Sequence, residues 1–193
     1  MASLFDQLEG EAFRKGIQAR SKEANVWFQK KAKALGPLGR NVLSDDRLLD
    51  GQQTRPGDMV MYIYDPKLKK TLPYYDTFPL SIVVGPAKDG FYAINLHYLP
   101  PKVRAIFLDK LGDIVSNKKF NATTKFRITY NLLKATKNYK YFKPCFKHYL
   151  TKHVSSKIAR VNAAEWNIAI FLQTASFKKA SQSKVWSESG KQY

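Results

Sequence analysis

The central part of the chain alternates apolar and polar residues in the way that β-strands require. The clearest alternation covers residues 91–99, and it places Tyr92, Ile94, Leu96 and Tyr98 on one face and Phe91, Ala93, Asn95 and His97 on the other. Two shorter strands are predicted over 58–64 and 81–84, with residues 85–90 as a connection. Short strands separated by turn residues predict a small curved sheet or an SH3-like barrel.

The period of the apolar residues changes to that of helices after Pro100. Pro101 suits the first turn of a helix, and the following apolar stripe is Val103, Ile106, Phe107, Leu111, Ile114 and Val115. A second helix is predicted to begin at Thr123 or Thr124 as N-cap, with an apolar face of Phe126, Tyr130 and Leu133. A third is predicted from Pro144, with Phe146, Tyr149, Leu150 and His153 on one side. Residues 163–172 predict a fourth, buried element.

The two ends of the chain are expected to differ from this centre. Residues 3–34 have helical spacing, interrupted by Gly10 and Gly16, so they predict one long helix or two short ones. Residues 36–56 are typical of a linker, and the Ser- and Lys-rich residues 176–193 of an extended arm. We therefore expect an α+β protein with an N-terminal helical arm and linker (1–55), a core (56–175; sheet 56–100, helices 101–175) and a C-terminal arm (176–193).

Charge is distributed unevenly along the 193 residues, whose net charge is +18. Residues 1–115 hold 17 Lys or Arg against 13 acids, whereas residues 116–193 hold 16 against 2. Between Asp113 and Glu165 there is no acid, and eight Phe or Tyr residues are interleaved with the basic ones. Unpaired positive charge repels itself, and nucleic acid is the commonest partner that offsets this cost.

The basic helices are therefore the best candidates for a DNA-binding surface. Arg127 and Lys134 are seven residues apart, as are Lys140 and Lys147, so a basic ridge along a helix is predicted. The expected phosphate contacts are Lys118, Lys119, Lys125, Arg127, Lys134, Lys137, Lys140, Lys143, Lys147 and Lys152. The alternative is that these lysines form a solvated surface or bind an acidic protein. The nearby aromatic residues either form the helix core or stack on bases.

Catalytic patterns are missing from the sequence. It has no Gly-rich phosphate loop, zinc signature or nucleophile elbow, and the three histidines do not form a site. Asp109 and Asp113 share a helix face, which is ordinary for solvated charge. The single cysteine, Cys145, is expected to pack in the core, with a reactive thiol as the alternative. We predict no enzyme, no cofactor and no metal, and the apolar runs are too short to span a membrane.

Four sequence blocks carry a resemblance to a known family. They are YDPK (64–67), LPYYDTFPL (72–80), GFYAINLHYLPP (90–101) and YKYFKPCFKHYL (139–150). Over residues 55–175 the chain resembles a small virion protein family of T4-like contractile-tailed phages, the DNA end-protector family. From the residues themselves, Tyr74, Tyr75, Phe78, Pro79 and Leu80 are expected at a core boundary. Asp76 is expected to anchor its loop through backbone amides, and Asn95 and His97 to form a polar network or a partner surface.

The resemblance implies a function without catalysis. It implies a virion protein, made in the host cytoplasm, that binds the ends of packaged linear double-stranded DNA and shields them from host exonuclease. Its other partners would be virion proteins of the portal, neck, tail or baseplate, and a symmetric oligomer in the particle is compatible with this role. The alternative is a structural connector of the neck, tail or baseplate, whose basic half binds acidic partner subunits.

Overall fold

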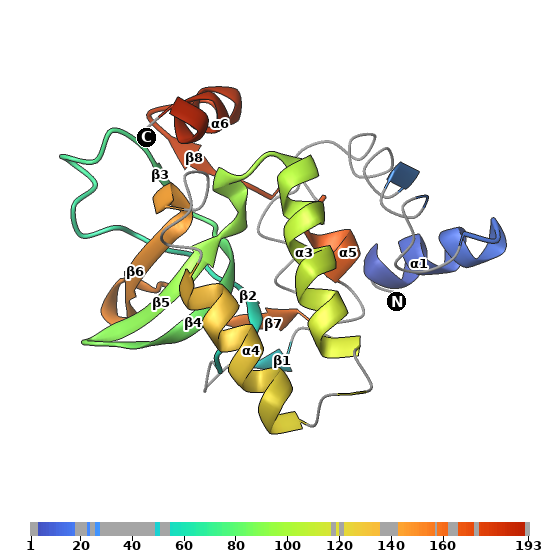
Figure 1. The fold of residues 1–193 in the computed structure, drawn as a ribbon. Helices are drawn as coiled ribbons and strands as arrows, with labels where there is room; N and C mark the ends of the chain where they lie inside the picture. The colour runs from blue at the N-terminus through green and yellow to red at the C-terminus, as the bar shows by residue number, and fades with distance from the viewer. Residues whose placement is uncertain are drawn as a thin grey trace.

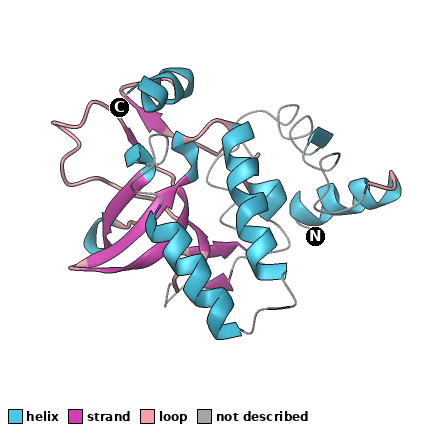
Figure 2. Ribbon diagram, viewed as in Figure 1, coloured by secondary structure: helices cyan, strands magenta, loops and turns pink. Residues whose placement is uncertain are grey.

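The structure is a computed structural model, and it confirms a mixed α+β fold (Figures 1 and 2). It describes residues 4–17, 23, 26, 27, 49, 50, 55–116, 119, 122–135, 143–156, 158–161, 166–171 and 174–191. The helices are α1 (Leu4–Arg14), α3 (Pro101–Ser116), α4 (Ala122–Ala135), α5 (Trp166–Ala169) and α6 (Gln182–Lys191). The strands are β1 (Leu49–Asp50), β2 (Met59–Met61), β3 (Tyr75–Asp76), β4 (Leu80–Ala87), β5 (Gly90–Asn95), β6 (Phe146–Leu150), β7 (Ala159–Val161) and β8 (Phe177–Lys178).

Six strands form one antiparallel sheet in the order β1-β7-β2-β4-β5-β6. The sheet is open, because the described strands leave β1 and β6 as its edges. The expected SH3-like barrel is therefore wrong, and the alternative of a small sheet holds. β1 lies inside the segment expected to be a linker, and it pairs with β7, in the C-terminal half. Residues 36–48 and 51–54 of this segment lie outside the described residues.

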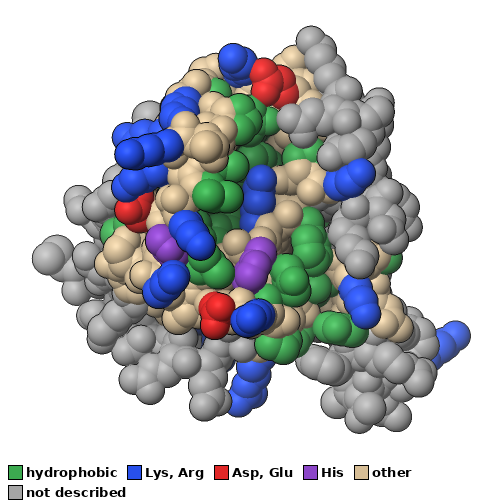
Figure 3. Space-filling view, turned by 90° about the vertical axis from the view of Figure 1, so that its left-hand side faces the viewer, with side chains coloured by type: hydrophobic (Ala, Val, Ile, Leu, Met, Phe, Trp, Pro, Cys, Tyr) green, Lys and Arg blue, Asp and Glu red, His purple; other side chains and the backbone are tan. Residues whose placement is uncertain are grey.

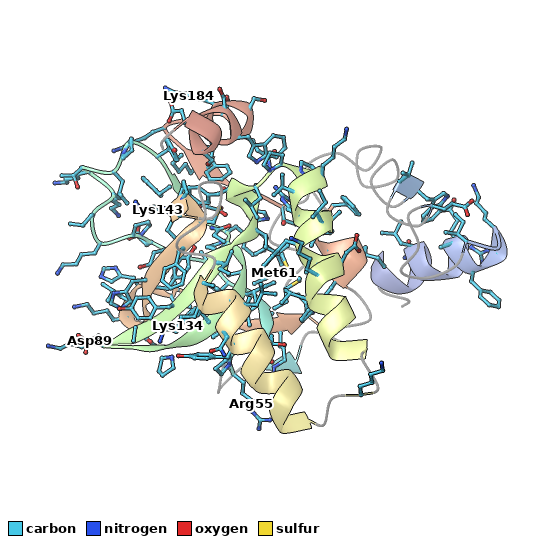
Figure 4. All side chains as sticks on the ribbon, viewed as in Figure 1. Arg55, Met61, Asp89, Lys134, Lys143 and Lys184 are labelled. Atoms are coloured by element: carbon cyan, nitrogen blue, oxygen red, sulfur yellow. The ribbon has the colours of Figure 1, made fainter. Side chains whose placement is uncertain are left out.

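Strands β4 and β5 form a tight hairpin rather than two strands joined by a six-residue loop. Pairing continues to Ala87 and Gly90, so the turn consists of Lys88 and Asp89. Asp89 has a φ of 60°, a left-handed conformation that aspartate tolerates in turns, and it lies at the tip in Figure 4. An irregularity in register between Val83 and Gly85 lies in β4.

The predicted third helix is wrong. Pro144 lies in a single 3₁₀ turn, η4 (Lys143–Cys145), after which the chain becomes β6. β6 pairs with β5, with Tyr149 opposite Phe91 and Phe146 opposite Ile94. The apolar residues of FKHYL fit a strand as well as a helix over such a short run, and pairing with β5 decides the outcome.

The first two helices predicted after Pro100 are present as α3 and α4. α3 begins at Pro101, as predicted, and lies beside α4 (Figure 1). Its stripe is shifted, because Ile106 is 58% exposed while Arg104 and Leu108 are buried. α4 begins at Ala122, which places both candidate cap threonines inside its first turn. Leu133 of α4 is fully buried, as the predicted apolar face requires.

Residues 176–191 contain a strand and a helix, so the extended arm expected over 176–193 is wrong for the part that the structure describes. β8 pairs with β3 in a separate two-stranded sheet. α6 follows and buries Val185 in the main core. The expected buried element before it is confirmed in part, because α5 is only one turn long, while Ile168, Ala169, Ile170 and Phe171 are buried. At the other end, α1 buries Leu8 and Ala12, and most of 18–34 lies outside the described residues.

The sheet separates two apolar clusters, so both of its faces are covered. The larger cluster contains Ile94 together with buried residues of α1, α3, α4, α5 and α6. The smaller consists of Val60, Tyr62, Tyr64, Val83, Phe91, Ala93 and Tyr149. Phe91 and Ala93 thus face away from Ile94, which confirms the predicted alternation over residues 91–95. The predicted strand beyond Asn95 is wrong, because Leu96–Tyr98 form a 3₁₀ turn, η2.

Candidate nucleic-acid interface

A buried polar network fixes the segment that borders the candidate interface. Both oxygens of the Asp76 carboxylate are used: Oδ1 accepts from the amides of Phe78 (3.0 Å) and Ser176 (3.1 Å). Oδ2 accepts from Asn95 Nδ2 at 3.1 Å and lies 2.6 Å from His97 Nδ1. The loop anchor and the polar network predicted from the sequence are therefore confirmed. They join β3, the end of β5 and the chain before β8.

The ionisation of this network is set by burial and by its hydrogen bonds. Burial opposes the charge on Asp76, but His97 and the amide donors outweigh it and lower the pKa of the carboxyl. Burial lowers the pKa of His97, so the neutral imidazole is favoured. In that form Nδ1–H donates to Asp76, and Nε2 accepts from Thr174 Oγ1 at 3.1 Å. His97 is thus structural, as the sequence predicted.

A second buried group, Arg104 of α3, is a structural cation. Its Nε donates to the Leu99 carbonyl at 2.7 Å and its Nη1 to the Ile170 carbonyl at 2.8 Å. Burial lowers the pKa of this guanidinium to about 10. Its Cζ lies 5.7 Å from the ring of Trp186 in α6, whose Nε1 donates to the His97 carbonyl. Arg104 therefore joins α3 to the residue that follows α5 and to α6, and it is not exposed to a DNA partner.

A pocket of about 300 Å³ opens beside the Asp76 network. One wall is formed by residues 64–76 and the other by β6. Its lining is Tyr64, Pro66, Lys67, Leu68, Leu72, Tyr74, Tyr75, Asp76, Tyr98, Lys147, His148, Tyr149 and Leu150. Figure 3 shows a hollow with hydrophobic side chains on this side of the molecule, with Lys or Arg and His side chains around it.

Lys147 is the basic residue that β6 brings into this pocket. It is half-buried, and its Nζ lies 4.3 Å from the centre of the Tyr98 ring. Burial lowers the pKa of its ammonium. Lys147 was predicted on a helical ridge with Lys140, and that arrangement is wrong because Lys147 lies in a strand.

The outer wall of the pocket is a basic loop, residues 66–72, which the sequence reasoning did not single out. Lys67, Lys69 and Lys70 are exposed on it. Lys179, just after β8, holds the loop from behind: its Nζ donates to the carbonyls of Lys69 (2.6 Å), Lys70 (3.0 Å) and Leu72 (3.0 Å). The LKKTLP segment does contain the basic residues, but its contact with Lys179 has no local sequence signal.

The structure brings together only some of the ten predicted phosphate contacts. Lys143, Lys147 and Lys152 lie just before, within and just after β6, and Lys143 and Lys152 are exposed. Lys134 is exposed on α4, and its Nζ lies 5.9 Å from the Tyr130 ring; Lys119 is also exposed. Figure 4 labels Lys134 and Lys143. Lys125 and Arg127 lie on α4 with side chains that are not described, and Lys118, Lys137 and Lys140 lie outside the described residues.

The aromatic residues of the basic half have both structural and exposed positions. Tyr149 is buried, with its ring centre 4.9 Å from that of Tyr64 and 5.3 Å from that of Tyr62, both edge-to-face. Phe146 is stacked on Tyr92, which is 38% exposed. Cys145 is buried, and burial raises the pKa of its thiol to about 12, which favours core packing over reactivity.

The described residues contain neither a cluster suited to a metal ion nor a helix able to cross a membrane. Asp109 is exposed on α3, and the side chain of Asp113 is not described. The surface around the pocket offers cations and aromatic rings, which suit phosphates and bases.

Comparison with known families assigns the chain to a class of phage proteins that protect DNA ends. A family profile described as "Phage T4 terminal DNA protecting protein" matches residues 7–189, and the chain belongs to this family. The resemblance stated from the four sequence blocks is thereby confirmed, and the match extends beyond residues 55–175 in both directions. Searches of curated proteins and of solved structures gave no match.

Proposed function

We propose that this chain binds the ends of packaged linear double-stranded DNA in the virion and protects them from host exonuclease without catalysing a reaction. The observation that carries the proposal is membership of a terminal DNA protecting family over residues 7–189. The surface chemistry supports it. Lysines around an aromatic-lined hollow can hold phosphates and an exposed base without reading a base sequence.

The proposed contacts fall into two groups. Lys143, Lys147 and Lys152 would contact the backbone along β6, next to the loop that carries Lys67, Lys69 and Lys70. The other seven predicted contacts are Lys118, Lys119, Lys125, Arg127, Lys134, Lys137 and Lys140, and they would extend the contact along the duplex. Phosphate contacts of this kind position a protein on DNA and depend strongly on salt.

The experiment that tests the proposal compares linear duplex with covalently closed circular duplex of the same sequence. Both compete for the protein at about 150 mM salt, and exonuclease digestion is followed in the same tubes. Preference for the linear form together with slower digestion supports end protection. Equal or negligible binding of the two forms refutes it. A connector in the neck, tail or baseplate would instead show poor DNA affinity and stable binding to an acidic virion subunit.

A further inference from the structure

We propose that the pocket between residues 64–76 and β6 receives the terminal nucleotide of a DNA strand, with the base against its tyrosines and the phosphate on Lys147. This inference rests on the proposed function and states how an end, rather than any stretch of DNA, would be selected. It is carried by three features of the pocket: its size, its lining and its half-buried cation.

The size of the pocket fits one nucleotide. A volume of about 300 Å³ is at the lower limit of small-molecule sites, which commonly range from about 300 to 1,000 Å³. A duplex cannot enter such a hollow, but a single splayed base with its sugar can. Five tyrosines line it, and Tyr75 is the one that is half-exposed and so available at the surface. An aromatic wall accepts any of the four bases, because every base has a π-face.

The charge in the pocket calls for an anion. Lys147 is half-buried, and within the described part of the chain no carboxylate forms an ion pair with it. Asp76 also lines the pocket, but both of its oxygens are occupied by four donors of the buried network. Lys67 adds a further donor to the lining, whereas the Nε2–H of His148 donates to the Lys88 carbonyl at 2.9 Å. A phosphate next to Lys147 would supply the negative charge that none of the described carboxylates provides.

The chemistry of DNA explains why such a pocket would prefer an end. A base inside a duplex is paired and stacked on both sides, so extruding it costs free energy. The terminal base has a neighbour on one side only, and it frays more easily. A pocket for one nucleotide therefore discriminates an end from the interior without reading the base edges.

The test uses three linear duplexes of the same sequence, bound by the full-length protein at about 150 mM salt. One has normal ends, one lacks the base of the terminal nucleotide on every strand end, and one is closed at both ends by hairpin loops. We expect the normal duplex to bind about 10-fold more tightly than the base-free duplex, since the stacking of one base is removed. The hairpin-closed duplex should bind at least as weakly as the base-free one.

Three variants locate the effect. Tyr75→Ala removes the exposed ring and should abolish the preference for normal over base-free ends. Lys147→Gln removes the cation and should weaken the binding of both, because both retain the terminal phosphate. Lys110→Gln removes the same charge from the exposed side of α3, and it should retain the preference. Because the comparison of normal with base-free ends by the unaltered protein is itself decisive, a variant that fails to fold does not leave the question open.

Two failures are distinguishable. Equal binding of normal and base-free ends by the unaltered protein overturns the pocket assignment, as does a preference that Tyr75→Ala retains, or an affinity for both ends that Lys147→Gln leaves unchanged. In either case end protection stands if linear DNA is still preferred to circular DNA. Loss of that last preference refutes the proposed function itself.

Discussion

The imidazole of His97 lies against the carboxylate of Asp76, with 2.6 Å between Nδ1 and Oδ2, at a place where neither side chain reaches solvent. The pKa of each group is lower than its ordinary value. For His97 this means that the unfolded chain, with a pKa near ~6.5, takes up a proton before the folded chain does. For Asp76 the carboxylate is stabilised by folding, and that stability is lost only when the pH falls below about 4.

Acidification should therefore destabilise the fold in two stages. Between pH 7 and 5 the free energy of unfolding should fall by up to about 2 kcal/mol, because the unfolded state binds the proton that His97 excludes. A further fall should follow below about pH 4 as Asp76 is protonated. Urea unfolding at each pH measures both stages. His97→Asn should flatten the first stage, whereas His148→Gln, at an exposed position, should retain it. A first stage unchanged in His97→Asn would contradict the assignment.

Removing the Lys179 ammonium should loosen the basic loop. Three carbonyls of the loop, from Lys69, Lys70 and Leu72, lose their donor in Lys179→Met. We expect trypsin to cleave after Lys69 and Lys70 several-fold faster than in the unaltered protein, since proteolysis needs a locally opened chain. The neighbouring exposed residue provides the control, and Lys178→Met should leave the cleavage rate unchanged. Equal rates in both variants would show that Lys179 does not hold the loop.

Two glycines should respond in opposite directions to alanine. A Cβ on Gly90 would overlap the Tyr149 carbonyl oxygen and come within 3.0 Å of Leu150 Cα, so Gly90→Ala must separate β5 from β6. We expect a loss of about 3 kcal/mol in the free energy of unfolding. Gly112 lies inside α3, and a Cβ there meets nothing within 4 Å among the described residues. Gly112→Ala should stabilise the protein by up to about 1 kcal/mol. Thermal and urea unfolding measure both, and a neutral Gly90→Ala would contradict the close approach.

DNA affinity should fall steeply and linearly on a plot of log K against log salt. Each lysine that binds a phosphate should account for about 0.9 of the slope. The double variant Lys143→Gln/Lys152→Gln should therefore lower the slope by about 1.8, because both residues flank β6 beside the pocket. Lys102→Gln/Lys110→Gln removes the same charge from exposed positions on α3 and should change the slope far less. Equal changes in the two double variants would point to a diffuse field rather than to contacts along β6.

The sequence correctly predicted features that depend on residues close together along the chain. Pro101 begins α3, and the alternation over 91–95 separates the two core clusters. Asp76 was predicted as a loop anchor because aspartate bonds to nearby amides in turns. Its bond to the amide of Phe78 is such a contact, whereas its bond to Ser176 joins residues that are 100 positions apart and has no local signal.

Predictions from the sequence were wrong where the structure of a segment depends on contacts with residues far away along the chain. Residues 146–150 (FKHYL) form a strand because they pair with the edge of β5. α6 was not predicted because the residues around Val185 are mostly polar and the apolar side of this helix is narrow. The pocket was not predictable for the same reason. It depends on Lys147 of β6 lying beside Tyr98, and the helix expected at Pro144 would have placed that lysine elsewhere. The sequence showed that the C-terminal half is rich in lysine, but it did not show that some of these lysines lie around a pocket.

Strand β7 lies between β1 and β2, although it follows them by about a hundred residues. During synthesis β1 therefore has no partner, and β2 has only β4, until about a hundred further residues have been made, and Ser176 and α6 follow later still. Contacts of such long range slow folding and expose unpaired strand edges meanwhile. A nascent chain would thus complete its sheet only after β7 has been made, and truncation before Ala159 would leave an aggregation-prone fragment rather than a smaller domain.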